Sequence, residues 1–402
     1  MKKVVVTGIG SISALGLNTD EFWDGLVSGK SGIKQITRIP LDKHDTTVAA
    51  EVDDAFEAVA SKYWKKRQLS ATTKATRMGL AAAGEAIEDC GADFSTLNGK
   101  RIAIIFGISD NSYEDGELDI KPNITLKRMP SAVPAMLAMK HGIQGATFNL
   151  STACASSGYA VALGKQLIQS GMYDMVITGG LSNTVSNVVI SGFNQVLAMS
   201  VDPDPSKTPR PFTKNRDGFI MGEGCGCIVI ESEEHAKARG ARIHCELAGV
   251  SMTCEAYNMT APKADGEGMA ESIEIALCDA GMSPDDIGYI NAHGTSTSLN
   301  DLYETMAIKK VFGERAYDIP VSSIKAAIGH TLAAGGALEG IACIKAIETG
   351  ILPPTVHYSE PDPELDLNYI PNKAIKRDIK AAVSNSFGFG GNDSTLIFRK
   401  YE

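Results

Sequence analysis

A single cysteine stands among small residues in the stretch NLSTACASSGYA, residues 149–160. The apolar, strand-like run GATFNL leads into it, and the helix-like segment SSGYAVALGKQLIQSG follows. A thiol at the start of a helix meets unpaired backbone N–H groups and the positive end of the helix dipole, which lower its pKa and favour the thiolate. Cys154 is therefore a candidate nucleophile for covalent acyl chemistry. The alternative is a packing role, because cysteine is often a small buried hydrophobe.

A second candidate is His293, which lies in NAHGTSTSLND, residues 291–301. The apolar run IGYI precedes it, and a histidine at the carboxyl end of a buried strand is well placed to face a crevice. A structural histidine with satisfied hydrogen bonds is the alternative interpretation. The hydroxyls of Thr295 and Thr297 either cap the following helix or bind an amide-containing substrate arm.

Three further polar residues lie in the small-residue segment SSIKAAIGHTLAAGGALEG, residues 322–340. They are Lys325, His330 and Glu339. A lone lysine there is ordinarily a solvated surface group. Because burying single charges among alanine and glycine is costly, the segment predicts a network of buried, mutually paired groups.

The Gly-rich turn SNSFGFGGNDS, residues 384–394, follows a predicted strand. Such a turn either supplies a backbone N–H donor for an oxyanion or simply makes a tight connection. It is not a phosphate loop, because the G-x-x-x-x-G-K-[ST] order is missing.

The elements that must position these residues alternate between short β-branched runs and helical segments. Alternating strands and helices predict an α/β architecture, and near-continuous Val/Ile runs predict strands buried on both faces. A charged helix-like segment near 233–242 divides the chain into halves of similar element order, although no residue-by-residue repeat is visible. The expected strands lie at 2–10, 101–109, 174–180, 225–232, 243–252, 287–294, 319–325, 381–391 and 394–400.

Composition excludes several classes of protein. With 402 residues, 44% of them hydrophobic and 21% charged, the chain resembles an ordinary globular protein. Its formal net charge of -10 argues against a nucleic-acid binder. The first apolar run is interrupted by Thr7, Gly8 and Gly10, so a buried strand is expected there rather than a signal peptide. No stretch reaches the roughly 18 apolar residues of a membrane span, which predicts a cytoplasmic protein without a membrane partner.

The eight cysteines have neither the density nor the spacing of a disulfide scaffold. Cys225 and Cys227 form C-x-C without a second Cys/His pair at zinc-site spacing. We therefore expect mostly reduced core cysteines and no metal site built from them.

One cysteine and two histidines, each in a turn rich in glycine and hydroxyl groups, form a set that packing alone does not predict. On these residues the sequence resembles the β-ketoacyl-acyl carrier protein synthases, most closely the elongating type II group, over nearly its whole length. The matching motifs, in family order, are STACASSGYA, RPFTKNRDGFIMGEGCG, YNMTAPKADGEG, INAHGTSTSLNDLYETMAIKKVFG, SSIKAAIGHTLAAGGALEG and NSFGFGG.

The resemblance implies a thiolase-like α/β fold in which two similar halves form a five-layer αβαβα arrangement. The N-terminal half, 1–241, would carry the nucleophilic cysteine, and the C-terminal half, 242–402, the two histidines. The implied reaction is a decarboxylative Claisen condensation of an acyl-enzyme with malonyl carrier protein, releasing carbon dioxide and requiring neither metal nor nucleotide. The resemblance implies that Cys154 is the nucleophile, that His293 and His330 donate hydrogen bonds to the enolate, and that Lys325 and Glu339 form a supporting network. It implies that Thr295 and Thr297 contact the pantetheine arm. The N–H groups of Cys154 and Phe389 would form the oxyanion hole, and the Phe389 side chain would also gate the acyl pocket.

The implied partner is an acyl carrier protein, which is acidic and must dock on an acidic enzyme. The resemblance places two basic stretches near the carrier entrance, and a solvated basic helix face is the alternative for both. The docking residues we expect are Lys65, Lys66, Arg67, Lys127 and Arg128. A homodimer is also expected, with a heterodimer with a chain-length partner as the alternative.

Three departures from the family pattern concern the substrate more than the chemistry. They are Ala326-Ala327 after the lysine, GGNDS in place of a glycine-glycine-threonine-asparagine type sequence, and GISDNSYEDGELDI at 107–120 in place of a more Gly-rich loop. Fatty-acid elongation is the preferred pathway, and a type II polyketide or polyene pathway is the alternative. A degradative thiolase is disfavoured because the matching positions give two histidines rather than a second cysteine, and a non-catalytic chain-length subunit is disfavoured because Cys154 is retained.

Overall fold

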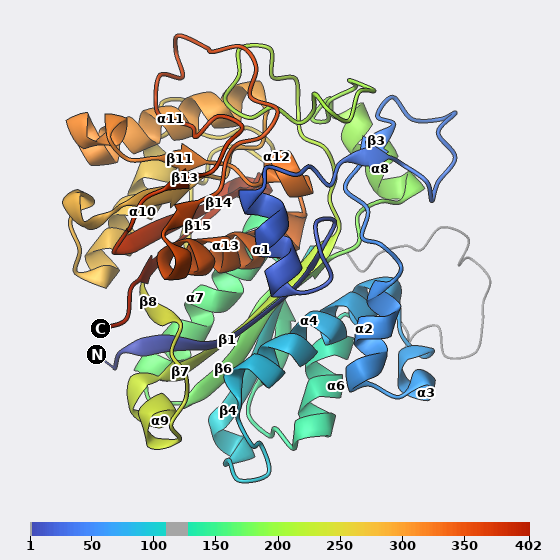
Figure 1. Cartoon of the computed structure of the whole chain (residues 1–402), viewed down its shortest axis with the longest axis vertical. Coiled ribbons are helices and arrows are strands. Elements are labelled where there is room, and N and C mark those ends of the chain that lie inside the picture. Colours follow the sequence, from blue (N-terminus) through green and yellow to red (C-terminus); the bar gives the residue numbers. More distant parts are fainter. Residues whose placement is uncertain (1, 110–127) are drawn as a thin grey trace.

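Strands of the N-terminal half lie side by side in the order β5-β4-β6-β7-β1 in the computed structural model, which describes residues 2–109 and 128–402 (Figure 1). β4 is parallel to β5 and β6, whereas β7 is antiparallel to β6 and β1. Every residue of β1, β4, β6 and β7 is buried, as the Val/Ile runs predict. The bounds are β1 (Val4–Ser13), β4 (Ile102–Ile108), β5 (Thr147–Leu150), β6 (Met175–Ser182) and β7 (Gly224–Ser232).

The C-terminal half repeats this arrangement in the order β11-β10-β14-β15-β8. β10 is parallel to β11 and β14, and β15 is antiparallel to β14 and β8. The two half-sheets join where β1 pairs with β8, through Val5 with Glu246 and Val6 with Cys245. The bounds are β8 (Cys245–Val250), β9 (Thr253–Cys254), which also pairs with β15, β10 (Tyr289–Asn291), β11 (Val321–Ser322), β14 (Ala381–Gly388) and β15 (Asn392–Arg399).

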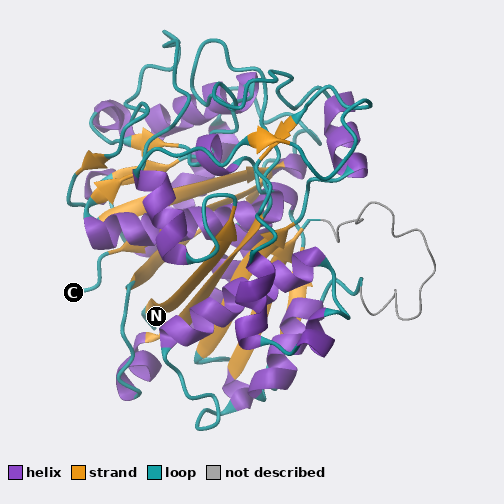
Figure 2. Cartoon of the chain, turned by 45° about the vertical axis from the view of Figure 1, so that its right-hand side comes forward, coloured by secondary structure: helices purple, strands orange, loops and turns teal. Residues whose placement is uncertain are grey.

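Helices cover both half-sheets and fill the space between them (Figure 2). α7 (Ser156–Gln169) packs on β6 and β4, α13 (Gly335–Thr349) packs on β14 and β7, and the two helices contact each other as a middle layer. α4 (Lys74–Cys90) and α6 (Ala132–His141) cover the outer face of the N-terminal half-sheet. α10 (Glu267–Ala280) covers β15 and β8, with α11 (Ser298–Phe312) packed beside it. The arrangement confirms the predicted αβαβα layers.

The remaining elements are shorter and lie around these layers. They are α1 (Thr19–Val27), α2 (Phe56–Tyr63), α3 (Lys66–Leu69), α8 (Asn187–Gln195), α9 (Glu233–Ala238), α12 (Lys325–Ile328), and the strand pairs β2 (Lys34–Gln35) with β3 (Val48–Ala49) and β12 (Ile351–Leu352) with β13 (Ile375–Lys376).

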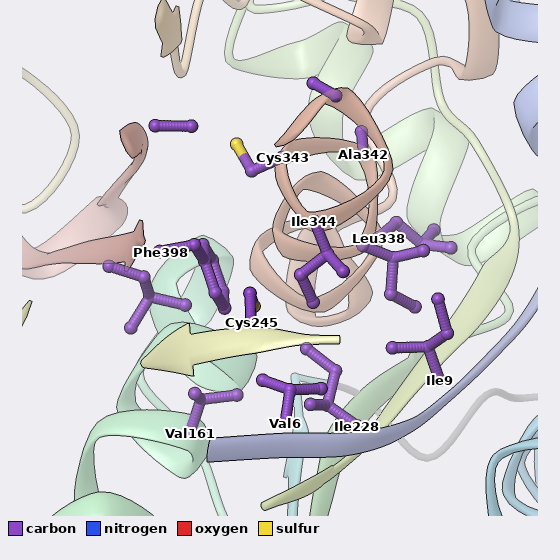
Figure 3. Packing of buried hydrophobic residues seen from close by; sticks show 14 of the residues in the cluster. Val6, Ile9, Val161, Ile228, Cys245, Leu338, Ala342, Cys343, Ile344 and Phe398 are labelled. Carbon is purple, nitrogen blue, oxygen red and sulfur yellow. The ribbon is translucent and has the colours of Figure 1, made fainter. Parts of the chain in front are cut away.

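A single hydrophobic cluster spans both halves (Figure 3). Val6 and Ile228 from the N-terminal half and Leu338, Ile344 and Phe398 from the C-terminal half are all buried in it. Because the two halves share this cluster, separating them would expose the apolar side chains of both halves to water. A division of the chain between residues 241 and 242, just before β8, stays a prediction.

All eight cysteines are free thiols, and only Cys254 and Cys278 are exposed. Cys225 and Cys227 lie within β7. None of the helices in the described ranges combines the length and the apolar character that a membrane crossing requires.

His244 links the two halves through a buried polar contact. Its Nε2 lies 2.7 Å from Asp89 Oδ2 on α4, and its Nδ1 lies 2.7 Å from Glu348 Oε1 on α13. Burial lowers the pKa of His244, but the hydrogen bonds and charges of the two carboxylates raise it, and the net direction is upward. Both carboxylates have lowered pKa values, so they stay ionised where the histidine titrates.

We expect this contact to make stability fall as the pH rises. A histidine whose folded pKa lies above its ordinary value of 6.5 stabilises the fold fully below 6.5, and the contribution is lost as the pH rises through the folded pKa. Denaturant midpoints from about pH 6 to pH 9 should therefore decline more steeply for the wild type than for His244→Gln. The control is His141→Gln. Burial lowers the pKa of His141 to about 4, so this histidine changes the pH dependence of stability only at pH values below 6.5. Parallel declines for wild type and His244→Gln would contradict the assignment.

Candidate active site

Several of the predicted residues line one cavity of about 340 Å³. They come from segments that leave the carboxyl ends of parallel strands, where such sheets place their crevices. Cys154 follows β5, His293 follows β10, and Phe389 follows β14. His330 follows α12, which itself begins shortly after β11. Thr295 and Thr297 also line the cavity.

Cys154 lies in a tight turn, Ala153–Ala155, immediately before α7. The Ser156 hydroxyl holds this turn, because it accepts the Thr152 N–H at 2.9 Å and donates to the Ala153 carbonyl at 2.6 Å. Small residues let the start of α7 approach the rest of the site. A Cβ at Gly158 would lie 2.8 Å from Ser394 Oγ, so no other residue fits there without displacement.

Burial decides the protonation state of Cys154. It raises the pKa of the thiol to about 11, while the backbone amides of Phe389 and Cys154 and the charge of Lys325 act in the lowering direction. The expectation that the helix start makes Cys154 a thiolate is therefore wrong for the free enzyme. The amides and the charge of Lys325 are outweighed by the loss of water around a residue that is only 7% exposed.

His330 and His293 face each other beside this thiol. His330 Nε2 lies 3.2 Å from Cys154 Sγ. The two imidazole centroids are 5.3 Å apart at an interplanar angle of 83°, and Phe219 and Phe387 pack edge-on against the pair. Burial, followed by the charge of Lys325, holds the pKa of both histidines well below 6.5. Both rings are therefore neutral, and each has one N–H to donate.

Lys325 and Glu339 form an ion pair beneath the histidines, at the start of α12 and within α13. Their side chains are only 2% and 1% exposed. The pairing confirms the expected network for the lysine and the glutamate, because neither charge is left alone in the interior, whereas the His330 side chain contacts Cys154 instead. Neither residue lines the cavity, so the pair acts on it through its electric field.

Glu304 is a site residue that the sequence analysis missed. It is fully buried, and its carboxylate accepts the N–H groups of His293 and Gly294, each at 2.8 Å, and the Asn385 side-chain amide at 3.1 Å. Burial raises the pKa of Glu304 to about 7, although the hydrogen bonds from these three donors act to lower it. The available signal was its place about two turns into α11, the helix after the histidine loop, where an acidic side chain can reach back to loop amides.

The hydroxyls of Thr295 and Thr297 lie 2.9 Å apart on the cavity wall. Thr297 is the residue that precedes α11, but its side chain makes no capping hydrogen bond. Helix capping was one of the two interpretations of these threonines, and it is not observed for Thr297.

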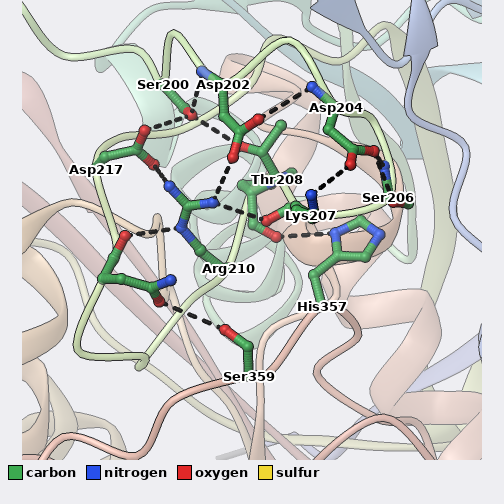
Figure 4. A network of polar contacts seen from close by, with 12 residues as sticks. Ser200, Asp202, Asp204, Ser206, Lys207, Thr208, Arg210, Asp217, His357 and Ser359 are labelled. Carbon is green, nitrogen blue, oxygen red and sulfur yellow. Dashed lines mark hydrogen bonds and ion pairs between the residues drawn. The ribbon is translucent and has the colours of Figure 1, made fainter.

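A polar network outside the cavity is centred on Arg210 (Figure 4), and the Arg210 backbone connects it to the turn that carries these threonines. The Arg210 guanidinium pairs with Asp202 at 2.7 Å and with Asp217 at 3.0 Å. The Arg210 backbone N–H then donates to Ser296 Oγ at 3.1 Å. Asp301 accepts the Ser296 N–H from the other side, so the turn is fixed at both edges.

Phe389 begins the Gly-rich turn, in which Gly390 and Gly391 have φ values of 82° and 70°. Such positive values favour glycine. The Phe389 ring lies 6.2 Å from the Phe193 ring, centroid to centroid, and both line the cavity. The Phe389 amide is also one of the groups that act to lower the Cys154 pKa.

The predicted docking residues lie elsewhere. Lys65, Lys66 and Arg67 are exposed at α3, and Lys65 lines a groove of about 520 Å³ between α3 and α6. Neither these three residues nor Arg128 lines the cavity that holds Cys154. Lys127 and most of the segment 107–120 lie outside the described residues.

Within residues 2–109 and 128–402, no group of three or more His, Cys, Asp or Glu side chains is arranged to hold a metal ion. The site as described offers a thiol, two neutral imidazoles and backbone amides. This set can form and cleave a thioester and can stabilise an enolate.

Comparisons with known proteins agree with this chemistry. The family model described as "Beta-ketoacyl synthase, N-terminal domain" matches residues 1–236, and "Beta-ketoacyl synthase, C-terminal domain" matches residues 244–359. The chain is 37% identical to the 3-oxoacyl-[acyl-carrier-protein] synthase 2 of Synechocystis sp. (strain ATCC 27184 / PCC 6803 / Kazusa), covering 100% of this chain and 99% of that protein. The chain also resembles two solved structures, with 33% identity and coverage of 100% of both chains in each case. One is a type II polyketide synthase acyl-carrier protein in complex with its ketosynthase bound to the hexaketide, with a TM-score of 0.90. The other is the ishigamide ketosynthase/chain length factor, with a TM-score of 0.91.

Proposed function

The chain belongs to the beta-ketoacyl synthase family, a family of condensing acyltransferases, and from that premise we propose that it extends an acyl chain held on Cys154 with a malonyl unit delivered by acyl carrier protein. The observation that carries the proposal is the placement of Cys154, His330 and His293 in one cavity, with Sγ and Nε2 only 3.2 Å apart. We propose that no metal or nucleotide cofactor takes part.

Acyl transfer is the first step. Cys154 Sγ attacks the carbonyl of the acyl carrier thioester, a C–S bond forms, and the bond to the carrier sulfur breaks. The thiol proton ends on the departing carrier thiol, so the exchange is balanced. The N–H groups of Cys154 and Phe389 hold the oxyanion, a contribution of about 3–4 kcal/mol for such donors. His330 in its Nε2–H form donates to the sulfur as negative charge develops there.

Condensation is the second step. The bond between the malonyl carboxylate and its α-carbon breaks, carbon dioxide leaves, and the electron pair forms an enolate. Neutral His293 and His330 donate hydrogen bonds to the enolate oxygen. The α-carbon then attacks the Cys154 thioester, and the thiolate leaves and takes up a proton from solvent, which balances the loss of carbon dioxide from a carboxylate. The product is a 3-oxoacyl thioester on the carrier.

Product analysis tests this function. The protein is incubated with octanoyl and malonyl carrier proteins, and the carrier-bound product is identified by mass spectrometry. A product longer by two carbons with a 3-oxo group, together with one carbon dioxide per turnover, is expected. Release of free octanoic acid without a longer product would contradict condensation.

Replacing either His293 or His330 with alanine should separate the two steps. Each variant loses one donor to the enolate, so decarboxylation should slow by about 10²–10³-fold. The acyl adduct on Cys154 should still form in both variants, because its oxyanion donors are backbone amides. It should form more slowly in His330→Ala than in His293→Ala, since His330 also donates to the sulfur. Quench-flow measurement of adduct and product separates the steps, and equal loss of both would contradict the assigned roles.

Fatty-acid elongation is the pathway we propose, in keeping with the 3-oxoacyl synthase named among the relatives. A type II polyketide or polyene pathway is the second candidate, and it is favoured by the two ketosynthase structures that match over the full chain. Turnover of a panel of acyl carriers separates them. Efficient use of saturated medium chains, with no gain from unsaturated or polar ones, would rule out the second candidate.

We propose that the carrier docks on the cations beside α3. Lys65, Lys66 and Arg67 are exposed and have no ion-pair partner among the described residues. An acidic carrier should gain from unpaired cations near its path. The carrier itself is supported by the ketosynthase structure in complex with its acyl-carrier protein.

Charge reversal in Lys65→Glu/Arg67→Glu should raise KM for carrier-bound substrate by roughly tenfold at low salt, because the attraction becomes repulsion. Activity on a small thioester mimic should change by less than about twofold, since the cavity is untouched. The matched control is Lys373→Glu/Lys376→Glu, an equal charge change on exposed lysines around β13. Equal losses on both substrates would end the docking proposal.

We also propose a homodimer in the cytoplasm. β5 ends the sheet path, and all of its residues are half-buried in the single chain, so it offers an edge for a second copy. A heterodimer is the alternative, prompted by the ketosynthase/chain length factor structure.

A further inference from the structure

Two carboxyl groups in the wall of the active-site cavity play no part in the proposed chemistry. Asp393 and Glu255 line the same cavity as Cys154. Asp393 is only 2% exposed, and within residues 2–109 and 128–402 its Oδ2 has no hydrogen-bond partner. Glu255 Oε1 is likewise buried and has no hydrogen-bond partner in the part of the chain that the structure describes. Buried oxygens without a hydrogen bond are rare and destabilising, so both need an explanation.

The strand register fixes where Asp393 lies. It is the cross-strand partner of Phe387 on β14 and of Thr253 on β9. Cross-strand partners share a face of the sheet, and the Phe387 ring lies 5.9 Å from the His293 ring, centroid to centroid. Asp393 therefore stands on the face of the sheet that is turned toward the histidines.

The charged neighbours of Asp393 are acidic. Glu255 and Glu304 both act on it as negative charges. The nearest cation to Glu255 is Lys263, whose backbone N–H donates to Glu255 Oε2 at 2.8 Å but whose ammonium pairs with Glu267. Burial, followed by the charge of Glu255, raises the pKa of Asp393 well above its ordinary value. A neutral carboxyl group can donate one hydrogen bond and accept others.

We propose that Asp393, with Glu255 beside it, is a binding site for a hydroxyl or amide group of the thioester substrate inside the active-site cavity. The proposal rests on the proposed function and narrows its substrate class. A site with a buried hydrogen-bonding group discriminates strongly against an analogue that lacks the matching group, because the protein group is then left unpaired. The polar group belongs either to the acyl chain or to the carrier arm.

Two matched substrate pairs test the proposal and separate these sources. The first pair is 3-hydroxyoctanoyl and octanoyl carrier protein, which differ only in the acyl hydroxyl. The second is octanoyl pantetheine and an analogue in which an ester replaces the amide nearest the sulfur. We expect wild-type kcat/KM to differ by tenfold or more within one pair, and the pair that shows it identifies the source.

Variants of the chain tie the effect to Asp393. Asp393→Leu should bring the two members of that pair within about twofold, while Asp393→Asn, which keeps a donor and an acceptor, should retain most of the difference. The matched control is Thr253→Val, because the Thr253 hydroxyl is also buried and has no partner among the described residues, but Thr253 does not line the cavity. It should leave the difference unchanged. Thermal midpoints establish that each variant is folded, and Asp393→Ala replaces a leucine variant that is not.

The outcomes are distinct from failure of the proposed function. Wild-type turnover without discrimination in either pair overturns the proposal and leaves the function standing. Discrimination that survives in Asp393→Leu or Asp393→Ala also overturns it. If the wild type extends none of the four thioesters, the proposed function fails, and the binding site falls with it.

Discussion

Replacing Cys154 with alanine is expected to abolish the acyl adduct and to lower condensation by about four orders of magnitude or more, since removal of a covalent nucleophile costs this much in comparable enzymes. The thiol forms the only covalent bond to the acyl group in the proposed reaction. Intact mass after incubation with a series of acyl carrier proteins should show one adduct on the wild type and none on Cys154→Ala.

Cys254→Ala is the matched control for this experiment. Cys254 is exposed, whereas Cys154 is 7% exposed and lies against His330, so general thiol reactivity favours the control position. We expect the control to retain both the adduct and the activity. An adduct that persists in Cys154→Ala and is lost in Cys254→Ala would show that Cys254 is the nucleophile and would contradict the proposal for Cys154.

Replacing Lys325 with methionine should lower the free energy of unfolding by about 3–5 kcal/mol, because it leaves Glu339 as an uncompensated buried carboxylate. The second change in Lys325→Met/Glu339→Leu removes that carboxylate, so the double variant should recover most of the lost stability. Denaturant unfolding of wild type, single and double variants measures both effects. A double variant no more stable than the single one would show that the ion pair is not the source of the loss.

Both Lys325→Met and Lys325→Met/Glu339→Leu should have low activity, although the double variant recovers most of its stability. The two effects of Lys325, on stability and on chemistry, can therefore be separated. Lys325 lowers the pKa values of His293 and His330, so its removal lets both imidazoles protonate at higher pH. We expect the acid limb of the pH–rate profile to move to higher pH in Lys325→Met and in the double variant alike. An unmoved limb would limit Lys325 to a structural role.

The sequence predicts local structure well wherever a pattern is self-sufficient. The Val/Ile runs at 101–109 and 174–180 correspond to β4 and β6, and the expected buried pairing is found between Lys325 and Glu339. The run at 319–325 was less informative, because only Val321–Ser322 is strand and Lys325 already begins α12. There the pairing with β10 decides the extent of the strand.

Residue types, their order and the small-residue turns around Cys154, His293 and Phe389 determined the family, the layered α/β fold and a short set of candidate residues, because these are properties of local segments. Only the tertiary structure decided that Sγ and Nε2 meet across 176 positions of chain. It also decided that burial outweighs the neighbouring amides in setting the Cys154 pKa, and that Glu304 holds the histidine loop. It placed Asp393 on the cavity wall with an oxygen that has no partner among the described residues. The physical reason is common to all of these. Burial and pairing depend on which distant segments exclude water from a side chain, and that is set by the packed fold rather than by neighbours in the sequence.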